Sequence, residues 1–275
     1  MQHDFDLDAY FARIGYSGPA TPQLETLCEL HRLHPQAIPF ENLNPLLRWP
    51  IRLDARSLQD KLVQQRRGGY CYEHNLLLKH ALERIGFRVA GLAARVLLNQ
   101  PEDAVRPRTH MLLQVDVEDE IWLADVGFGG MTLTAPLRLL EHVPQPTPHE
   151  PFRLTRMAGD YALQAEVRGA WRTLYRFDVQ EQVLPDYELT SWYLSNHPES
   201  RFVVNLIAAR TEPGRRYALL NDELAVHELN RESVRRKLTS ADELRETLRA
   251  TFRIDVPESA ELDARFAAIL SQAEA

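Results

Sequence analysis

A cysteine at the start of a helical pattern is the first sign of chemistry in this sequence. Cys71 follows the glycines 68 and 69, and apolar residues then recur at helical spacing until Gly86. This pattern predicts a helix over residues 71–85 with the thiol in its first turn. The unpaired N–H groups and the positive dipole end there favour a thiolate. Cys71 is therefore a candidate nucleophile, and the alternative is a small buried hydrophobic residue.

A nucleophilic thiol needs a base, and the base needs an orienting group. His110 and Asp125 each interrupt an apolar run in neighbouring predicted strands. The alternative is a buried pair satisfied by backbone groups. A tight turn at 118–120 would place Asp125 opposite residue 113 or 114, with His110 on the order of 10 Å further along. A bulge or a different register is needed to bring them together.

The composition excludes several classes of protein. The chain has 275 residues and a formal net charge of −7 without a basic block, which argues against a nucleic-acid partner. No run of about 18 apolar residues is present, so we expect no membrane span. The first residues lack the features of a signal peptide. Cys28 and Cys71 are too few for a disulfide scaffold, which predicts a reducing, cytoplasmic location.

Ten histidines occur without cysteines at zinc spacing, so we expect no metal. His31 and His34 lie in a predicted helix and are interpreted as surface residues. Cys28, on the leucine stripe of the same helix, is interpreted as a structural thiol.

The hydrophobic period changes along the chain and predicts three parts. Residues 1–86 are mostly helical, with helices expected at 7–14, from Thr21 to about Leu33, and from Ser57. Residues 87–188 are rich in strands and hairpins, which predicts a small antiparallel barrel. Residues 189–275 mix both kinds of element: a short helix, strands at 202–209, 217–220 and 223–229, and two final helices. The expected class is α+β.

Several motifs in this order resemble the arylamine N-acetyltransferases. The motifs are Pro39–Leu43, Arg67–Asn75, Thr109-His110, Asp125–Gly130 and Trp192–Pro198 with Phe202 and Asn205. The similarity covers nearly the whole chain and weakens after about residue 210. The family often has glutamine where this chain has His74, which adds a second titratable group near the thiol.

The resemblance implies a fold and a reaction. The implied fold is a helical N-terminal domain (1–86) carrying the nucleophile, an antiparallel β-barrel (87–188) carrying the histidine and aspartate, and an α/β lid (189–275). Its core would resemble papain-like and transglutaminase cysteine enzymes. The implied reaction is ping-pong transfer of an acetyl group from acetyl-CoA to an arylamine or hydrazine through acetyl-Cys71.

The resemblance also implies roles for individual residues. Cys71, His110 and Asp125 would form the catalytic triad. Phe40, Phe128 and Phe202 match positions that line the acceptor pocket. Gly129, Gly130 and Asn205 would contact CoA, while Glu41 and Arg67 would form a buried structural pair.

Three other functions remain open on the sequence. A peptidase or transglutaminase-like hydrolase could use the same triad, a non-catalytic protein could bind CoA or an aromatic compound, and a related enzyme could form amides in biosynthesis. The physiological amine and the oligomeric state stay open too.

Overall fold

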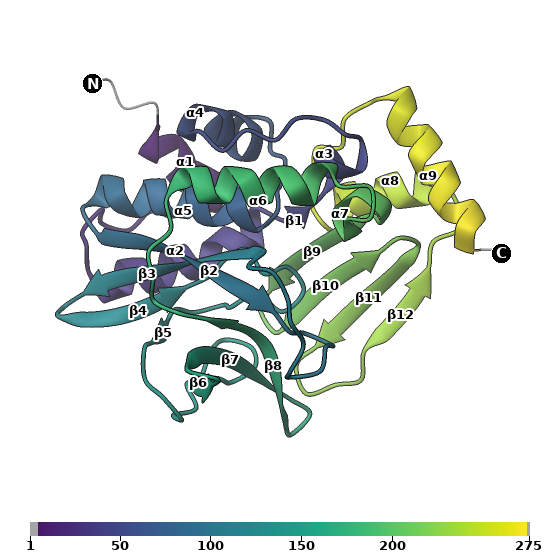
Figure 1. Ribbon diagram of the computed structural model, residues 1–275. Coiled ribbons are helices and arrows are strands. Elements are labelled where there is room, and N and C mark those ends of the chain that lie inside the picture. The colour runs from purple at the N-terminus through teal and green to yellow at the C-terminus, as the bar shows by residue number, and fades with distance from the viewer. Residues whose placement is uncertain (1–4, 274–275) are drawn as a thin grey trace.

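The computed structural model describes residues 5–273 and is shown in Figure 1. Its N-terminal part is helical, with one short strand and one π-helical turn, η1. The first helix ends as expected, because Asp6 accepts a hydrogen bond from the Ala9 N–H and Gly15 closes the helix at a φ of 74°. The elements are α1 (Leu7–Ile14), α2 (Leu24–Ala37), β1 (Phe40–Glu41), α3 (Leu43–Leu46), α4 (Ala55–Leu58), η1 (Gln59–Gln64) and α5 (Cys71–Ile85).

Two helix starts differ from the sequence predictions. The second helix begins at Leu24 after a cap at Gln23, and it continues through Pro35 to Ala37. Asp54, and not Ser57, opens α4, because its carboxylate accepts the Ser57 N–H at 3.0 Å. Asp54, three residues before Ser57, is therefore the residue that marks the start of this helix.

The middle of the chain forms a nearly closed antiparallel barrel. Its seven strands run in the order β5-β4-β3-β2-β8-β7-β6. The chain after β5 closes the gap towards β6, where Gln145 and Phe152 exchange backbone hydrogen bonds of 2.7 and 3.0 Å. The strands are β2 (Arg88–Val96), β3 (His110–Val117), β4 (Glu120–Ala124), β5 (Leu137–Arg138), β6 (Phe152–Met157), β7 (Asp160–Val167) and β8 (Ala170–Phe177).

The remaining elements make a second sheet with helices beside it (Figure 1). The sheet order is β1-β9-β10-β11-β12, so the short strand β1 joins the N-terminal part to the C-terminal one. The strand predicted at 202–209 is wrong in its first half, which is helical in α7. The elements are α6 (Leu184–Asn196), α7 (Arg201–Val204), β9 (Ile207–Glu212), β10 (Arg215–Leu220), β11 (Glu223–Glu228), β12 (Val234–Lys237), α8 (Ala241–Ala250) and α9 (Ala260–Ala273).

The buried apolar side chains form three clusters. One lies between the N-terminal helices and the sheet face formed by Met111, Leu113 and Val115. Another fills the barrel, and a third lies between the C-terminal sheet and α8 and α9. The α+β class is confirmed. The division into domains at 1–86, 87–188 and 189–275 remains our proposal. The first cluster includes residues from all three parts, so the proposed domains share a core. Between residues 5 and 273, no helix is both long and apolar enough to cross a membrane.

Candidate active site

Cys71 is the first residue of α5, as the sequence predicted, and its residue surface is only 4% exposed. The Glu73 carboxylate accepts the Tyr70 N–H at 3.0 Å and so fixes the start of the helix. Gly68 lets the preceding loop pass β1, because a Cβ there would lie 1.9 Å from the Pro39 carbonyl oxygen. The thiol donates to the Thr109 carbonyl oxygen, with Sγ 3.8 Å away. Cys71 therefore lies directly beside the chain that leads into His110.

His110 and Asp125 meet, with Nε2 and Oδ2 2.7 Å apart. The hairpin register expected from the sequence was wrong. Glu118 and Asp119 alone form the turn, both at positive φ, and Val117 pairs with Glu120. Continuing the pairing of Leu113 with Ala124 puts Asp125 opposite residue 112, two positions from His110 and on the same sheet face. No bulge is needed to join the two side chains.

Asp125 is fully buried and accepts four hydrogen bonds. Oδ2 accepts from His110 and from the Tyr175 hydroxyl at 2.9 Å. Oδ1 accepts from the Asn75 side-chain amide at 3.1 Å and from the Gly127 N–H at 3.0 Å. Such saturation is what keeps a buried carboxylate charged.

The charges of this pair shift both pKa values in opposite directions. Burial alone would lower the pKa of His110, but the adjacent Asp125 carboxylate and the Cys71 thiol raise it to about 10. Burial would raise the pKa of Asp125, yet the imidazolium and its hydrogen bonds hold that pKa below its usual value. The pair is therefore an imidazolium and a carboxylate at neutral pH. Because Nε2 of His110 is taken by Asp125, Nδ1 is the nitrogen left for Cys71.

His74 is occupied elsewhere. Its Nδ1 lies 3.0 Å from His34 Nε2, and its Nε2 lies 3.1 Å from the Pro39 carbonyl oxygen. The chain of bonds continues from His34 Nδ1 to the Tyr10 hydroxyl at 2.9 Å. The Pro39 carbonyl can only accept, so His74 donates from Nε2 and accepts at Nδ1. His34 therefore donates from Nε2 to His74, and its Nδ1 accepts the hydrogen bond of the Tyr10 hydroxyl. Both ring nitrogens of His74 are thus engaged away from the thiol.

The prediction that His31 and His34 are surface residues was wrong, because both are completely buried. His31 Nε2 accepts the backbone N–H of Asp125 at 3.0 Å, so it supports the site from α2. Cys28 is only partly buried, and burial with Glu25 and Glu29 nearby raises the pKa of its thiol. Leu27 and Leu30 of the predicted leucine stripe are buried, as expected. The buried face of α2 is wider than that stripe and also includes His31 and His34.

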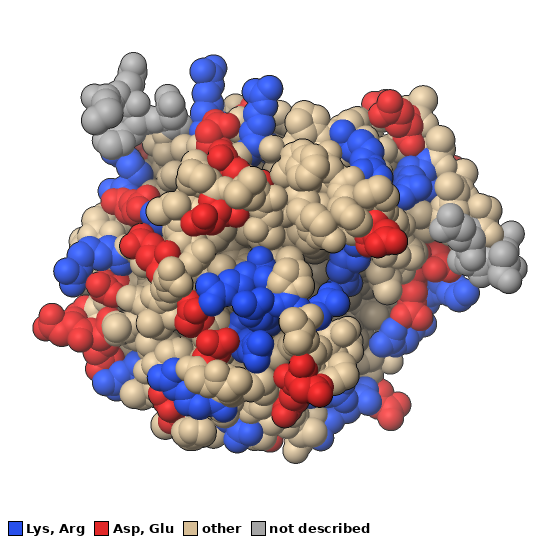
Figure 2. Space-filling view, in the orientation of Figure 1, with Lys and Arg blue, Asp and Glu red and all other residues tan. Residues whose placement is uncertain are grey.

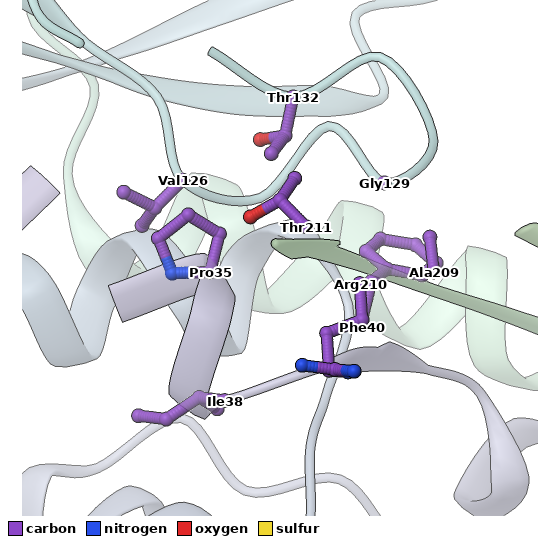
Figure 3. A pocket seen from close by; sticks show the side chains of 9 residues that line it. All are labelled: Pro35, Ile38, Phe40, Val126, Gly129, Thr132, Ala209, Arg210 and Thr211. Atoms are coloured by element: carbon purple, nitrogen blue, oxygen red, sulfur yellow. The ribbon is translucent and has the colours of Figure 1, made fainter. Parts of the chain in front are cut away.

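The three aromatic residues that were predicted to line the acceptor pocket lie in two separate places. Phe40 and Phe202 lie with ring centroids 6.1 Å apart. Phe128 packs edge-on against His110, with centroids 5.0 Å apart, and against Tyr175. A cavity of about 10 Å³ lies behind Phe40 (Figure 3), which is room for one water and far too small for an aromatic ring.

The glycine-rich loop passes tightly over the nucleophile. A Cβ at Gly127 would lie 2.9 Å from the Cys71 Cα, so only glycine fits there. Gly129, at a φ of 84°, faces the Phe40 ring, and Gly130 lies nearest Ala218. Asn205 hydrogen-bonds inside the protein, through its side chain to Arg201 and Asn221. Contacts of Gly129, Gly130 and Asn205 with CoA remain predictions.

Two residues of the site were not assigned a role from the sequence. Tyr175 lies on β8, far along the chain, and no local pattern distinguishes its hydroxyl from that of a core tyrosine. Asn75 stood inside the cysteine motif. Its amide donates to Met111 and Asp125 and accepts the Val126 N–H, so it ties α5 to β3 and to the segment after β4. The predicted pair of Arg67 and Glu41 is confirmed as buried, at 2.6 Å.

This arrangement can form and break acyl bonds at sulfur. The thiol lies at a helix N-terminus, and an imidazolium oriented by a buried carboxylate can stabilise its thiolate. The aromatic rings around His110 and Phe40 keep the surroundings apolar, which protects a reactive thioester from water.

Comparisons with known proteins agree with this chemistry. A family model described as N-acetyltransferase matches residues 23–261. An arylamine N-acetyltransferase of Mycobacterium tuberculosis H37Rv is 45% identical over 261 residues, covering 93% of this chain and 92% of that protein. The Escherichia coli K12 arylamine N-acetyltransferase is 41% identical, covering 92% of this chain and 90% of that protein.

Solved structures give the same result. The arylamine N-acetyltransferase of Mycobacterium marinum superposes with a TM-score of 0.93 at 42% identity, covering 96% of this chain and 100% of that one. The same M. marinum protein has been solved in complex with CoA, and that structure matches with a TM-score of 0.92, covering 96% of this chain and 99% of that one.

Proposed function

Because this chain belongs to the arylamine N-acetyltransferase family, we propose that it transfers an acetyl group from acetyl-CoA to an arylamine or hydrazine through acetyl-Cys71. One observation carries the proposal. Cys71 opens α5 beside His110, and the His110 ring is held by Asp125 at 2.7 Å. In this proposal Cys71 is the nucleophile, His110 the base and Asp125 the orienting group, and all three are buried and adjacent.

In the first half-reaction, the Cys71 thiolate attacks the thioester carbonyl. The backbone N–H of Cys71, a first-turn group, is positioned to stabilise the oxyanion. The carbon–sulfur bond to CoA then breaks, and the CoA thiolate takes a proton from the His110 imidazolium. The enzyme is left as an acetyl thioester with a neutral histidine.

In the second half-reaction, the amine nitrogen attacks the acetyl-cysteine carbonyl. His110 accepts the proton that the amine loses, and Cys71 leaves as a thiolate beside the re-formed imidazolium. Asp125 holds Nε2 as a donor throughout, so Nδ1 remains the working nitrogen. Arylamines suit this step because they are uncharged at neutral pH and enter an apolar site with a free lone pair.

The pocket residues follow from the same proposal. Phe40 and Phe202 pack together beside Tyr70, the residue before the nucleophile, and Phe128 lies against the base. We assign these rings to the acceptor. The loop with Gly129 and Gly130, together with Asn205, is assigned to CoA.

The experiment that tests the proposal is intact mass spectrometry after incubation with acetyl-CoA and no amine. We expect one added acetyl group, located on Cys71 by peptide mapping and removed when an arylamine such as aniline is added. The Cys28→Ala variant should behave as wild type, and Cys71→Ala should gain nothing. A folded wild-type protein that binds acetyl-CoA without acetylation would exclude the transferase. Turnover of a peptide or glutamine substrate without CoA would favour the hydrolase instead.

A further inference from the structure

His74 holds the backbone that leads into Phe40. The His74 ring is completely buried on α5, one turn after Cys71, and its Nε2 donates to the Pro39 carbonyl oxygen at 3.1 Å. That carbonyl belongs to the peptide plane that precedes Phe40, and a planar peptide turns only as a unit. A donor on the Pro39 oxygen therefore fixes the direction in which the chain enters Phe40.

The same histidine also contacts the Phe40 side chain. The two rings are nearly parallel, at an interplanar angle of 7°, with their centroids 6.2 Å apart. The Phe40 ring lies 6.1 Å from the Phe202 ring, and a Cβ at Gly129 would lie 3.6 Å from it. His74 is therefore the neighbour that holds both the ring and the backbone of Phe40.

The short strand β1 is tied to the motif that contains the nucleophile. The Glu41 N–H donates to the Gly69 carbonyl oxygen at 2.8 Å, and the Gly69 N–H donates to the Pro39 carbonyl oxygen at 3.4 Å. The bond from His74 is the shorter of the two bonds that the Pro39 oxygen accepts. The cysteine motif therefore sets the position of β1 as well as that of the thiol.

The rest of the histidine chain keeps His74 in the tautomer that this contact needs. His34 Nε2 donates to His74 Nδ1 at 3.0 Å, and the Tyr10 hydroxyl donates to His34 Nδ1 at 2.9 Å. Because Nδ1 of His74 accepts, its single proton stands on Nε2 and faces the Pro39 oxygen.

We propose that His74 is a positioning residue that sets the preference of the enzyme for aromatic acceptors, by holding Phe40 where it packs against the acceptor ring. This inference rests on the proposed function, because it takes Phe40 as a wall of the acceptor pocket. The wall offers an acceptor apolar rings, unlike the surface below α6, where Figure 2 shows basic side chains gathered. An aromatic acceptor gains from such a wall only if the ring is held at the right place, because contacts between rings depend on their geometry.

The test compares two amide substitutions that differ in reach. In His74→Gln, the amide nitrogen lies at about the place of Nε2 and can donate to the Pro39 oxygen. In His74→Asn, the amide ends at about the place of Nδ1, so it can accept from His34 but cannot reach Pro39.

The readout is the rate constant for acetyl transfer from isolated acetyl-enzyme to phenylhydrazine, divided by that for transfer to hydrazine. Hydrazine carries the same reacting group without the ring. Both rates are measured on the same acetyl-enzyme, so their ratio does not depend on how much of a variant is folded.

We expect His74→Asn to lower this ratio about fivefold to tenfold, the effect of one net hydrogen bond, while acetylation of Cys71 by acetyl-CoA stays within about twofold. His74→Gln should keep the ratio near that of wild type. Phe40→Leu should lower the ratio by itself, and adding His74→Asn to it should then change little. His149→Asn is the matched control, because His149 is another buried histidine whose Nε2 donates to a backbone carbonyl, that of Glu212. Its ratio should stay that of wild type.

Several results would overturn the proposal. These are an unchanged ratio in His74→Asn, and an equal fall in His74→Gln or in His149→Asn. A further fall when His74→Asn is added to Phe40→Leu would show that His74 acts by a route other than Phe40. A His74→Asn variant that forms no acetyl-enzyme would place its effect on the nucleophile and contradict the proposal as well. A wild type that forms no acetyl-enzyme would instead contradict the proposed function.

Discussion

Cys71 and Cys28 differ in solvent exposure and in the charges around them. Exposure favours reaction at Cys28, whereas the surrounding charges favour reaction at Cys71. Cys28 is the more exposed, but burial and two glutamates raise the pKa of its thiol. Cys71 is nearly buried, but it stands at a helix N-terminus beside an imidazolium. We therefore expect the charges around each thiol, and not its exposure, to decide which cysteine reacts.

We predict that limited iodoacetamide at pH 7 alkylates Cys71 first and abolishes acetyl transfer in proportion. Peptide mapping at increasing times measures both sites. In the Cys71→Ala variant, Cys28 should react at the rate of a free model thiol or slower. Faster labelling of Cys28 in wild type would show that exposure outweighs ionisation.

Asp125 is the residue whose role its contacts define most closely. All four of its partners donate hydrogen bonds. In Asp125→Asn, the fixed Gly127 N–H keeps the amide oxygen on its own side, so the NH₂ group faces His110. The ring must then accept at Nε2 and carry its proton on Nδ1, where it cannot take a proton from the thiol.

We expect Asp125→Asn to slow acetylation of Cys71 roughly 10² to 10⁴-fold at pH 7, less than the loss of about 10⁴ in a serine triad, because a thiol is the more acidic nucleophile. The rate should recover partly towards about pH 8.5, where an unperturbed thiol ionises. Single-turnover acetylation against pH measures this, with circular dichroism to confirm folding. Tyr175→Phe, which removes one donor and keeps the charge, should lose less. A near-normal rate in folded Asp125→Asn would reduce the triad to a dyad.

Among the elements, α1, α2 and α5 are joined through buried neutral histidines. Burial, the largest effect, lowers the pKa of His31 and of His74 to about 4. Burial and the neighbouring His74 and His31 lower the pKa of His34 too. The unfolded chain binds protons at all three histidines from about pH 6.5 downwards, while folded His31 and His74 do not until about pH 4 and His34 also resists protonation. Stability is therefore lost as the pH falls through this window.

We predict a loss of about 1.4 kcal/mol per pH unit for each of these histidines between pH 6 and 4.5. Urea unfolding at several pH values measures the slope. His74→Gln, which cannot titrate, should remove about one histidine's share of it. His110 contributes with the opposite sign at higher pH, because its raised pKa stabilises the fold below 6.5 and that gain is lost towards 10. A pH-independent free energy of unfolding between 6 and 4.5 would contradict the buried neutral histidines.

The helices and strands were predicted from the sequence more accurately than the contacts and registers between them. The helix at Cys71 and the hairpin of β7 and β8 follow from local periodicity, and both were found. The register of β3 and β4 could not be predicted, because a three-residue turn at 118–120 suits the composition as well as the observed two-residue turn. His31 and His34 look polar in sequence, and only the packing of α2 against α1, α5 and the chain after β4 buries them. Tyr175 reaches Asp125 across the barrel, which no short pattern encodes.

At the scale of the whole molecule, one thiol serves both halves of the proposed reaction. Initial rates over a grid of acetyl-CoA and arylamine concentrations should therefore give parallel double-reciprocal lines. Free CoA should compete with the amine, because both react with the acetyl-enzyme. Intersecting lines, together with failure to isolate an acetyl-enzyme, would indicate direct transfer in a ternary complex.

The pairing of β1 with β9 has a consequence for the synthesis of the protein. Phe40 pairs with Ala209, and the Asn42 side chain is bonded to Phe202, Asn205 and Ile207. The wall beside the nucleophile is therefore incomplete until β9 has left the ribosome, long after Cys71 itself has emerged. A nascent chain would carry its cysteine, histidine and aspartate through most of translation before the proposed acceptor pocket exists. Activity should thus arise late and in one step, as the last sheet forms.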